Sequence, residues 1–156
     1  YTLNTKITKE TEKICDELKM NDELIINSPG GSLPSSIKLA NCIYFKDIKV
    51  KLKQGFSGAA HITLAAKKIC FISESSVIGL HSPIQTSFTG RRSEYTGEQM
   101  REFLRSTMRL FVGFDYTVKE AAFIVAGIVL HGPDDLGYLK GKYLKDLLGD
   151  RYVGIC

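Results

Sequence analysis

In the first half of the chain, segments with the hydrophobic pattern of a strand alternate with segments whose apolar residues recur at the spacing of a helix. The apolar run at residues 23–27, bounded by turn residues, predicts a buried parallel strand. Residues 32–44 then carry apolar positions at helical spacing, with Ser32 placed to cap the helix. Residues 48–52 alternate apolar residues with lysine, which predicts a strand with one wetter side. A short amphipathic helix over residues 9–18 precedes them all.

The second half continues this alternation and then becomes helical. The expected elements are a small-residue helix over 59–67, strands over 69–72 and 77–80, a polar loop or hairpin over 83–94, helices over 98–114 and 118–130, and one more strand or helix over 138–148. Alternating strands and helices favour an α/β fold with a mainly parallel sheet of βαβ units wrapped by helices. No repeat or linker interrupts the 156 residues, so one domain is expected over 1–156.

Composition and charge narrow the functional classes. The hydrophobic content of 44% can fill a core, and no apolar run reaches the roughly 18 residues that span a bilayer. The net charge of +4 comes from lysines and arginines scattered among acids. The one tight pair, Arg91–Arg92, has no aromatic residues interleaved with it, so a nucleic-acid partner is not expected.

Four cysteines lie far apart, without a CxxC pair or a histidine at ligand spacing: Cys15, Cys42, Cys70 and Cys156. We therefore expect no metal site and no cofactor. Cys42 and Cys70 lie in apolar stretches and are expected to be buried. Whether any cysteines form a disulfide stays open, because the compartment is unknown.

The stretch Gly55-Phe56-Ser57-Gly58 is the first candidate for chemistry. A serine between a strand end and a helix start lies at the positive end of the helix dipole, and flanking glycines allow a sharp turn. The nucleophile elbow of hydrolases uses the same arrangement, although GxSxG itself is absent. The alternative is that Ser57 only caps the helix.

Histidines supply candidate bases. His81 follows an apolar strand directly, and in parallel α/β sheets ligands gather at the carboxyl ends of strands. His61 lies four residues after Ser57 on the same helical face, so it is either a rival base or an ordinary helix residue. His131 lies at a helix end and is expected to cap it.

Two further segments complete the set. Asp134-Asp135 follows a Gly-Pro pair that breaks the preceding helix. The two acids could form the N-cap and first turn of the next element, or one carboxylate could orient a histidine. In Asn27-Ser28-Pro29-Gly30-Gly31, two glycines leave backbone N–H groups unobstructed. One such N–H, with another beside Ser57, could stabilise an oxyanion.

In this order the segments resemble the ClpP-type serine peptidases of the ClpP/crotonase superfamily. LIINSPGGSLPSSIKLANCI is similar to that family's strand, Ser-Pro-Gly-Gly turn and helix. QGFSGAAHITLAAKKICFISESSVIGLHSP resembles the block that carries its serine and histidine. GPDDLGYLKGKYLKDLLGD resembles its closing segment. The resemblance is good from about residue 22 to 83 and thinner beyond.

The resemblance implies acyl transfer through a serine, with peptides or unfolded protein as substrate. The implied roles are nucleophile Ser57, base His81, acid Asp135 with Asp134 as alternative, and oxyanion residues Gly30, Gly31 and Gly58. Phe-Ser-Gly at the nucleophile departs from the Ala-Ser-Met of ClpP and is closer to SppA relatives. Those relatives use a lysine base, which has no clear counterpart here. The alternatives are a crotonase-like acyl-CoA binder and a catalytically degenerate scaffold of the same fold.

The resemblance also bears on assembly and location. Residues 85–97 occupy the place of the family's handle region, so a homo-oligomer is expected. The sequence begins with Tyr1 and not with Met, so the N-terminus is expected to be processed or truncated. Because Tyr1 lies close to the first strand, the segment that ClpP uses around its axial pore has no counterpart, and docking to an unfolding ATPase is not expected. The closing segment resembles exported or membrane-associated relatives, which favours an exported protein over a cytoplasmic one.

Overall fold

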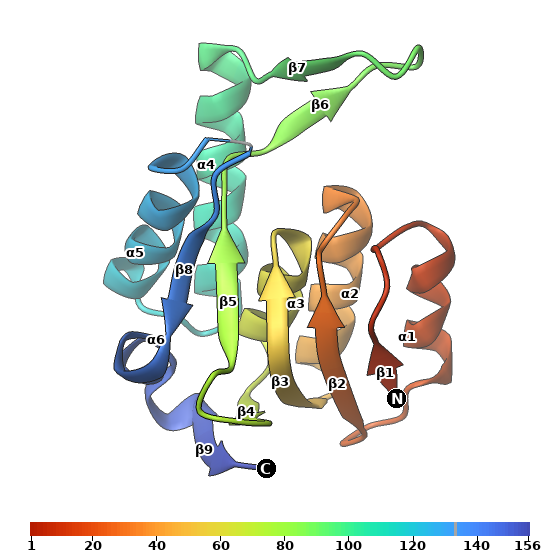
Figure 1. Ribbon diagram of the computed structural model, residues 1–156, viewed down its shortest axis with the longest axis vertical. Coiled ribbons are helices and arrows are strands. Elements are labelled where there is room, and N and C mark those ends of the chain that lie inside the picture. The colour runs from red at the N-terminus through yellow and green to blue at the C-terminus, as the bar shows by residue number, and fades with distance from the viewer. Residues whose placement is uncertain (133) are drawn as a thin grey trace. The chain divides into compact units, whose positions relative to one another are not determined.

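The computed structural model describes residues 1–132 and 134–156, which form two compact units (Figure 1). The sheet unit comprises residues 1–79 and 138–156, and the helical unit comprises residues 80–137. The single domain expected from the sequence stays a prediction.

The sheet unit is built on a mainly parallel sheet, which confirms the predicted α/β class. Its strands are β1 (Thr2–Leu3), β2 (Glu23–Ser28), β3 (Lys49–Phe56), β4 (Lys68–Phe71), β5 (Val77–Leu80), β8 (Gly137–Lys140) and β9 (Tyr152–Ile155). The order is β1-β2-β3-β4-β9, and β5 pairs with β3 and β8. The first half of β3 pairs with β4 and its last three residues pair with β5, so the two neighbours share one edge of β3.

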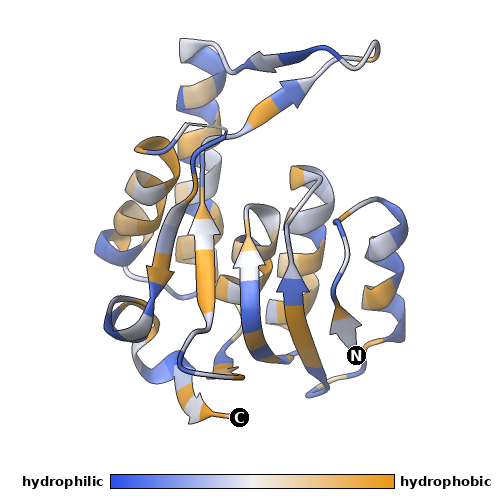
Figure 2. Ribbon diagram, viewed as in Figure 1, coloured by the Kyte–Doolittle hydropathy of each residue, from blue (hydrophilic) through white to orange (hydrophobic). Residues whose placement is uncertain are grey.

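Helices cover one face of this sheet, where its apolar side chains point. They are α2 (Leu33–Phe45) and α3 (Gly58–Ala65), and both lie behind β2 and β3 in Figure 1. Every second residue of β2 and the first half of β3 is buried, namely Leu24, Ile26, Ser28, Val50 and Leu52. All of α3 is buried, and its small first residues let it pack closely on α2. The pattern of apolar residues is visible in Figure 2.

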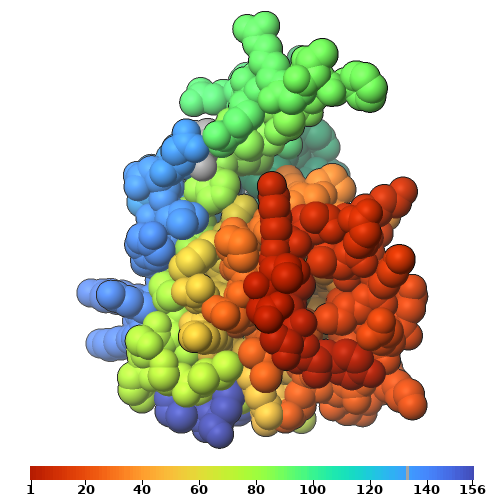
Figure 3. Space-filling model, turned by 45° about the vertical axis from the view of Figure 1, so that its right-hand side comes forward, coloured from red at the N-terminus to blue at the C-terminus, as the bar shows by residue number. Residues whose placement is uncertain are grey.

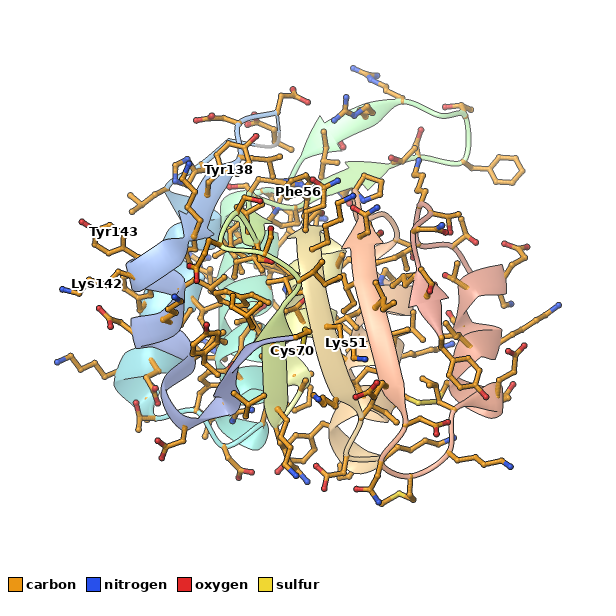
Figure 4. The ribbon with its side chains drawn as sticks, turned by 60° about the horizontal axis from the view of Figure 1, so that its bottom comes forward. Lys51, Phe56, Cys70, Tyr138, Lys142 and Tyr143 are labelled. Atoms are coloured by element: carbon orange, nitrogen blue, oxygen red, sulfur yellow. A yellow bond between two sulfur atoms is a disulfide. The ribbon has the colours of Figure 1, made fainter. Side chains whose placement is uncertain are left out.

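The other face of β2 and β3 is wetter, as the alternation with lysine predicts. Glu23 forms ion pairs with Lys51 and with Lys49, the latter at 3.2 Å. The hydrogen bonds from Lys51 and then Lys49 lower the pKa of Glu23 below its ordinary value. Lys51 is labelled on this face in Figure 4.

The N-terminal segment joins α2 through polar contacts. It contains η1 (Glu10–Lys13) and α1 (Ile14–Glu17), seen in red beside the orange of α2 in Figure 3. Ser35 Oγ donates to Glu12 at 2.8 Å and Lys38 Nζ lies 3.1 Å from the same carboxylate. These two donors, Ser35 first, lower the pKa of Glu12.

Two disulfides answer the question that the cysteines left open. Cys15–Cys42 joins α1 to α2, with Cα atoms 6.1 Å apart. Cys70–Cys156 joins β4 to the last residue of the chain, with Cα atoms 5.3 Å apart (Figure 4). Cys42 and Cys70 are buried, as expected.

The helical unit contains a hairpin and two capped helices. The hairpin strands β6 (Ile84–Thr86) and β7 (Arg92–Glu94) are antiparallel, within the predicted polar segment. Helices α4 (Gly97–Gly113) and α5 (Val118–Val129) each begin with a capping box. Phe111 contacts Phe114 and Tyr116 edge to face in the core of this unit. No described helix is long and apolar enough to cross a membrane.

The predicted elements differ from the structure mainly at the sheet edges. Strands β1 and β9 have no counterpart in the prediction, and residues 138–148 form both β8 and α6 (Gly141–Leu148), followed by η2 (Gly149–Arg151). An edge strand of two to four residues is too short for a period to be recognised, so only its partner strand defines it. The core strand β3 also continues beyond residue 52 to Phe56, which places Ser57 at its end.

Candidate active site

Ser57 lies in a strained turn between β3 and α3. Its φ is +55° and its ψ is −121°, a backbone conformation that costs a non-glycine residue about 1–3 kcal/mol. Ser57 occupies the N-cap position of α3, but its half-buried side chain makes no hydrogen bond that caps the helix. In a nucleophile elbow, the serine likewise lies on a sharp, strained turn between a strand and a helix.

The glycine turn after β2 lies directly against Ser57. Gly30 has φ +90°, and a Cβ there would lie 2.7 Å from Ser57 Cβ and 3.1 Å from Gly58 N. The structure therefore brings together two of the segments that the sequence singled out, although 27 positions separate Gly30 from Ser57 (57 − 30). Only a glycine lets the two backbones approach this closely.

Hydrogen bonds within the turn distinguish the two glycines. The Gly30 N–H donates to Ser28 Oγ at 3.2 Å, and Ser28 Oγ donates to the Thr5 carbonyl at 2.7 Å. The Gly31 N–H makes no hydrogen bond in the described part of the chain, and Gly31 is half-buried. Of the two glycines, Gly31 is therefore the one whose N–H has no hydrogen-bond partner in the described part of the chain.

Ile7 fixes Gly31 from the other side. Ile7 N donates to the Gly30 carbonyl at 2.8 Å, and Ser32 N donates to the Ile7 carbonyl at 2.9 Å. A Cβ on Gly31 would lie 2.7 Å from Ile7 N. Ser28 and Ile7 were not among the sequence candidates, because their contribution depends on contacts with residues far away in the chain.

Gly58 opens α3 and faces α2. A Cβ on Gly58 would lie 2.8 Å from the Cβ of buried Ser36, so the close packing of the two helices requires glycine. The N–H of Gly58 is in the first turn, where backbone donors have no partner within the helix. The positive end of the helix dipole lies at the same place.

In the helical unit, His81 bonds to the backbone of its neighbour. Its Nδ1 lies 2.7 Å from the Ser82 carbonyl, and because a carbonyl only accepts, Nδ1 carries the proton. In the neutral tautomer with this proton on Nδ1, Nε2 would be the acceptor. Ser82 is anchored in turn, since its Oγ donates to the His131 carbonyl at 2.6 Å.

The two aspartates have other partners among the described residues of this unit. Asp134 pairs with Arg92 at 3.2 Å, and Asp135 lies 3.4 Å from His131 Nδ1. Both carboxylates are largely exposed. The Ser82 carbonyl therefore occupies the position at His81 Nδ1 that the sequence analysis predicted for an aspartate. The His131 side chain contacts Asp135, whereas the sequence predicts a helix cap there.

Phe56, the residue before Ser57, contacts a second aromatic side chain. The rings of Phe56 and Tyr138 meet edge to face, with centroids 5.9 Å apart (Figure 4). Among the described residues, no group of three or more histidine, cysteine or acidic side chains could hold a metal ion.

Solved structures with the same architecture decide the fold. A serine-to-alanine mutant of the 1510-N membrane-bound stomatin-specific protease superposes with TM-score 0.70 at 14% identity, covering 99% of this chain and 77% of that one. A lysine-to-alanine mutant of the same protease in complex with a substrate peptide gives 0.71 at 15%, covering 99% and 73%. ClpP1 from Listeria monocytogenes gives 0.66 at 16%, covering 99% and 89%.

The chain has the ClpP-type fold. This confirms the family resemblance at the level of the fold. No protein-family model matches the sequence, and no curated protein matches it. At 14–16% identity the likeness to these structures shows the fold alone.

We expect Gly30→Ala to destabilise the sheet unit by about 2–5 kcal/mol, because the new Cβ would combine overpacking with a strained φ. The methyl group would press on Ser57, so any reaction of that serine should slow as well. Urea unfolding and the rate of serine labelling would measure the two effects.

Gly90→Ala is the matched control for this prediction. Gly90 also has a positive φ, +81°, but nothing lies within 4 Å of a Cβ there. Equal losses of stability in the two variants would show that the contact with Ser57 contributes nothing.

Proposed function

We propose that the chain is a serine peptidase that hydrolyses peptide bonds through an acyl-enzyme on Ser57. The observation that carries this proposal is the strained turn at Ser57, at the carboxyl end of β3. This turn lies against the Gly30–Gly31 turn that follows β2. Strain of this kind persists only where surrounding contacts hold it, and such residues concentrate at active sites.

The proposed reaction follows from the roles available to these groups. His81 Nε2 takes the proton of Ser57 Oγ as the oxygen attacks the peptide carbonyl carbon, and the Gly31 and Gly58 N–H groups donate to the resulting oxyanion. The C–N bond then breaks, and the imidazolium gives its proton to the leaving amine. Water, deprotonated by the same histidine, hydrolyses the ester and restores Ser57.

The orienting group for His81 is proposed to be the Ser82 carbonyl, because it already accepts the Nδ1 proton at 2.7 Å. Asp135 and Asp134 remain the predicted acids from the family resemblance. The existing pairs, Asp135 with His131 and Asp134 with Arg92, would have to break for either aspartate to reach His81. These pairs favour the second candidate function, a catalytically degenerate binding or scaffold protein of the same fold.

We propose peptides or unfolded protein segments as the substrate class, since one structure with this fold holds a substrate peptide. A homo-oligomer stays an expectation from the family resemblance. We also propose an oxidising compartment, because both disulfides would be reduced in a typical cytosol.

Labelling with a fluorophosphonate probe tests the proposal. The native chain should acquire one covalent adduct, and peptide mass mapping should place it on Ser57. The heat-unfolded chain is the control and should not react, because an unactivated serine is a weak nucleophile. A native chain that remains unlabelled at every pH from 6 to 9 would favour the degenerate scaffold.

A further inference from the structure

His61 is a buried histidine beside the candidate nucleophile, and the proposed mechanism does not use it. It lies on α3, one turn after Ser57, and only 5% of it is exposed. Its Nδ1 is 3.2 Å from the main-chain oxygen of Ser57. A carbonyl oxygen only accepts, so Nδ1 carries the proton and acts as the donor.

This hydrogen bond acts on the strained residue itself. The Ser57 carbonyl also accepts from Ala60 N at 3.0 Å, and Ser57 N donates to the Gly79 carbonyl at 2.8 Å. The backbone is therefore held on both sides of the Ser57 Cα. The direction of the Ser57 carbonyl sets its ψ, and two donors hold that carbonyl in place.

We propose that His61 is a positioning residue that holds Ser57 in its strained conformation. This inference rests on the proposed function. With Nδ1 bound to the carbonyl, this nitrogen of His61 does not reach for the hydroxyl proton, so its contribution acts through the backbone. The side chain locks the turn that presents Ser57 Oγ.

Thr63 provides a matched comparison on the same helix. Its Oγ1 donates to the Ala59 carbonyl at 2.9 Å, and the residue is fully buried. The bond is again one from a side chain to the carbonyl four residues earlier. It differs from the His61 bond in that it does not touch Ser57.

The experiment compares three variants by second-order labelling rate with the fluorophosphonate probe and by thermal unfolding. His61→Leu removes the donor at similar volume, whereas His61→Asn keeps an N–H near the position of Nδ1. Thr63→Val removes the control bond. We expect His61→Leu to label roughly 10–100-fold more slowly, as for a small misplacement of a reacting group.

His61→Asn should restore most of this rate, and Thr63→Val should label as the native chain does, whatever each costs in stability. With a peptide substrate, the loss in His61→Leu should fall on kcat and leave KM unchanged. Should the leucine variant not fold, His61→Gln replaces it, because its amide N–H lies one atom farther from the main chain.

Three outcomes would overturn the inference. Native-like labelling of His61→Leu would show that Ser57 needs no such support, and equal losses in His61→Leu and His61→Asn would assign the effect to packing. Equal slowing in Thr63→Val would assign it to the general stability of α3. An unlabelled native chain is a different result, because it removes the proposed function and the inference together.

Discussion

Ser57→Ala is expected to lower peptide hydrolysis by about 10⁴–10⁶-fold and to abolish fluorophosphonate labelling. The reason is that the oxygen that forms the acyl-enzyme is lost, while the oxyanion donors and substrate contacts remain. The free energy of unfolding should change by less than about 1 kcal/mol. Alanine would adopt the same positive φ as Ser57, and the hydroxyl that is removed makes no capping hydrogen bond to α3. Turnover of a fluorogenic peptide and thermal unfolding would be measured together.

His81→Ala should cause a loss of similar size, and the double variant should be little worse than either single one, because the two groups act as a unit. Ser75→Ala, at an exposed serine in the turn between β4 and β5, is the control and should retain full turnover. Hydrolysis that survives in Ser57→Ala would rule out Ser57 as the nucleophile.

Cys156→Ser is expected to lower the free energy of unfolding by about 4–5 kcal/mol, because Cys70–Cys156 closes a loop with a sequence separation of 86. This is a large share of the roughly 5–15 kcal/mol that stabilises a typical domain. Changing Cys156 is preferable to changing Cys70, since Cys156 is exposed and Cys70 is buried. Urea unfolding of the oxidised protein would measure the difference.

Cys15→Ser is the matched comparison, with an expected loss of about 3.5 kcal/mol, because that disulfide spans a separation of only 27. Dithiothreitol should destabilise the native chain by more than either single variant. Four free thiols in the denatured, unreduced protein would show that neither disulfide forms, and would remove the argument for an oxidising compartment.

The strands and helices near the candidate site could largely be predicted from the sequence. The apolar run before Gly30 and the small residues after Ser57 each have a local period and a local boundary. Strand β9 could not be predicted, because its four residues owe their conformation to pairing with β4 and to the Cys70–Cys156 disulfide. The disulfide pairing could not be predicted either, since the spacing of the cysteines does not show which of them lie close together in the fold.

The candidate site divides in the same way. Residue types and their order were sufficient to single out Ser57, His81 and the glycine turn. The sequence named Gly30, Gly31 and Gly58 together as oxyanion residues, whereas the structure shows the Gly30 N–H donating to Ser28 and leaves the Gly31 N–H unbonded among the described residues. Which of the two glycine N–H groups is bonded depends on the fold of this turn, which the sequence does not reveal.

By itself, the sequence determined the alternation of strands and helices, and it placed a serine between glycines where a strand meets a helix. Both follow from local properties, namely the period of apolar side chains and the freedom of glycine. Only the tertiary structure decided that Ser57 is strained, that Gly30 touches it and that His61 bonds to its carbonyl. A positive φ at a serine is unfavourable in isolation, so it exists only because the packed neighbours of Ser57 hold it there.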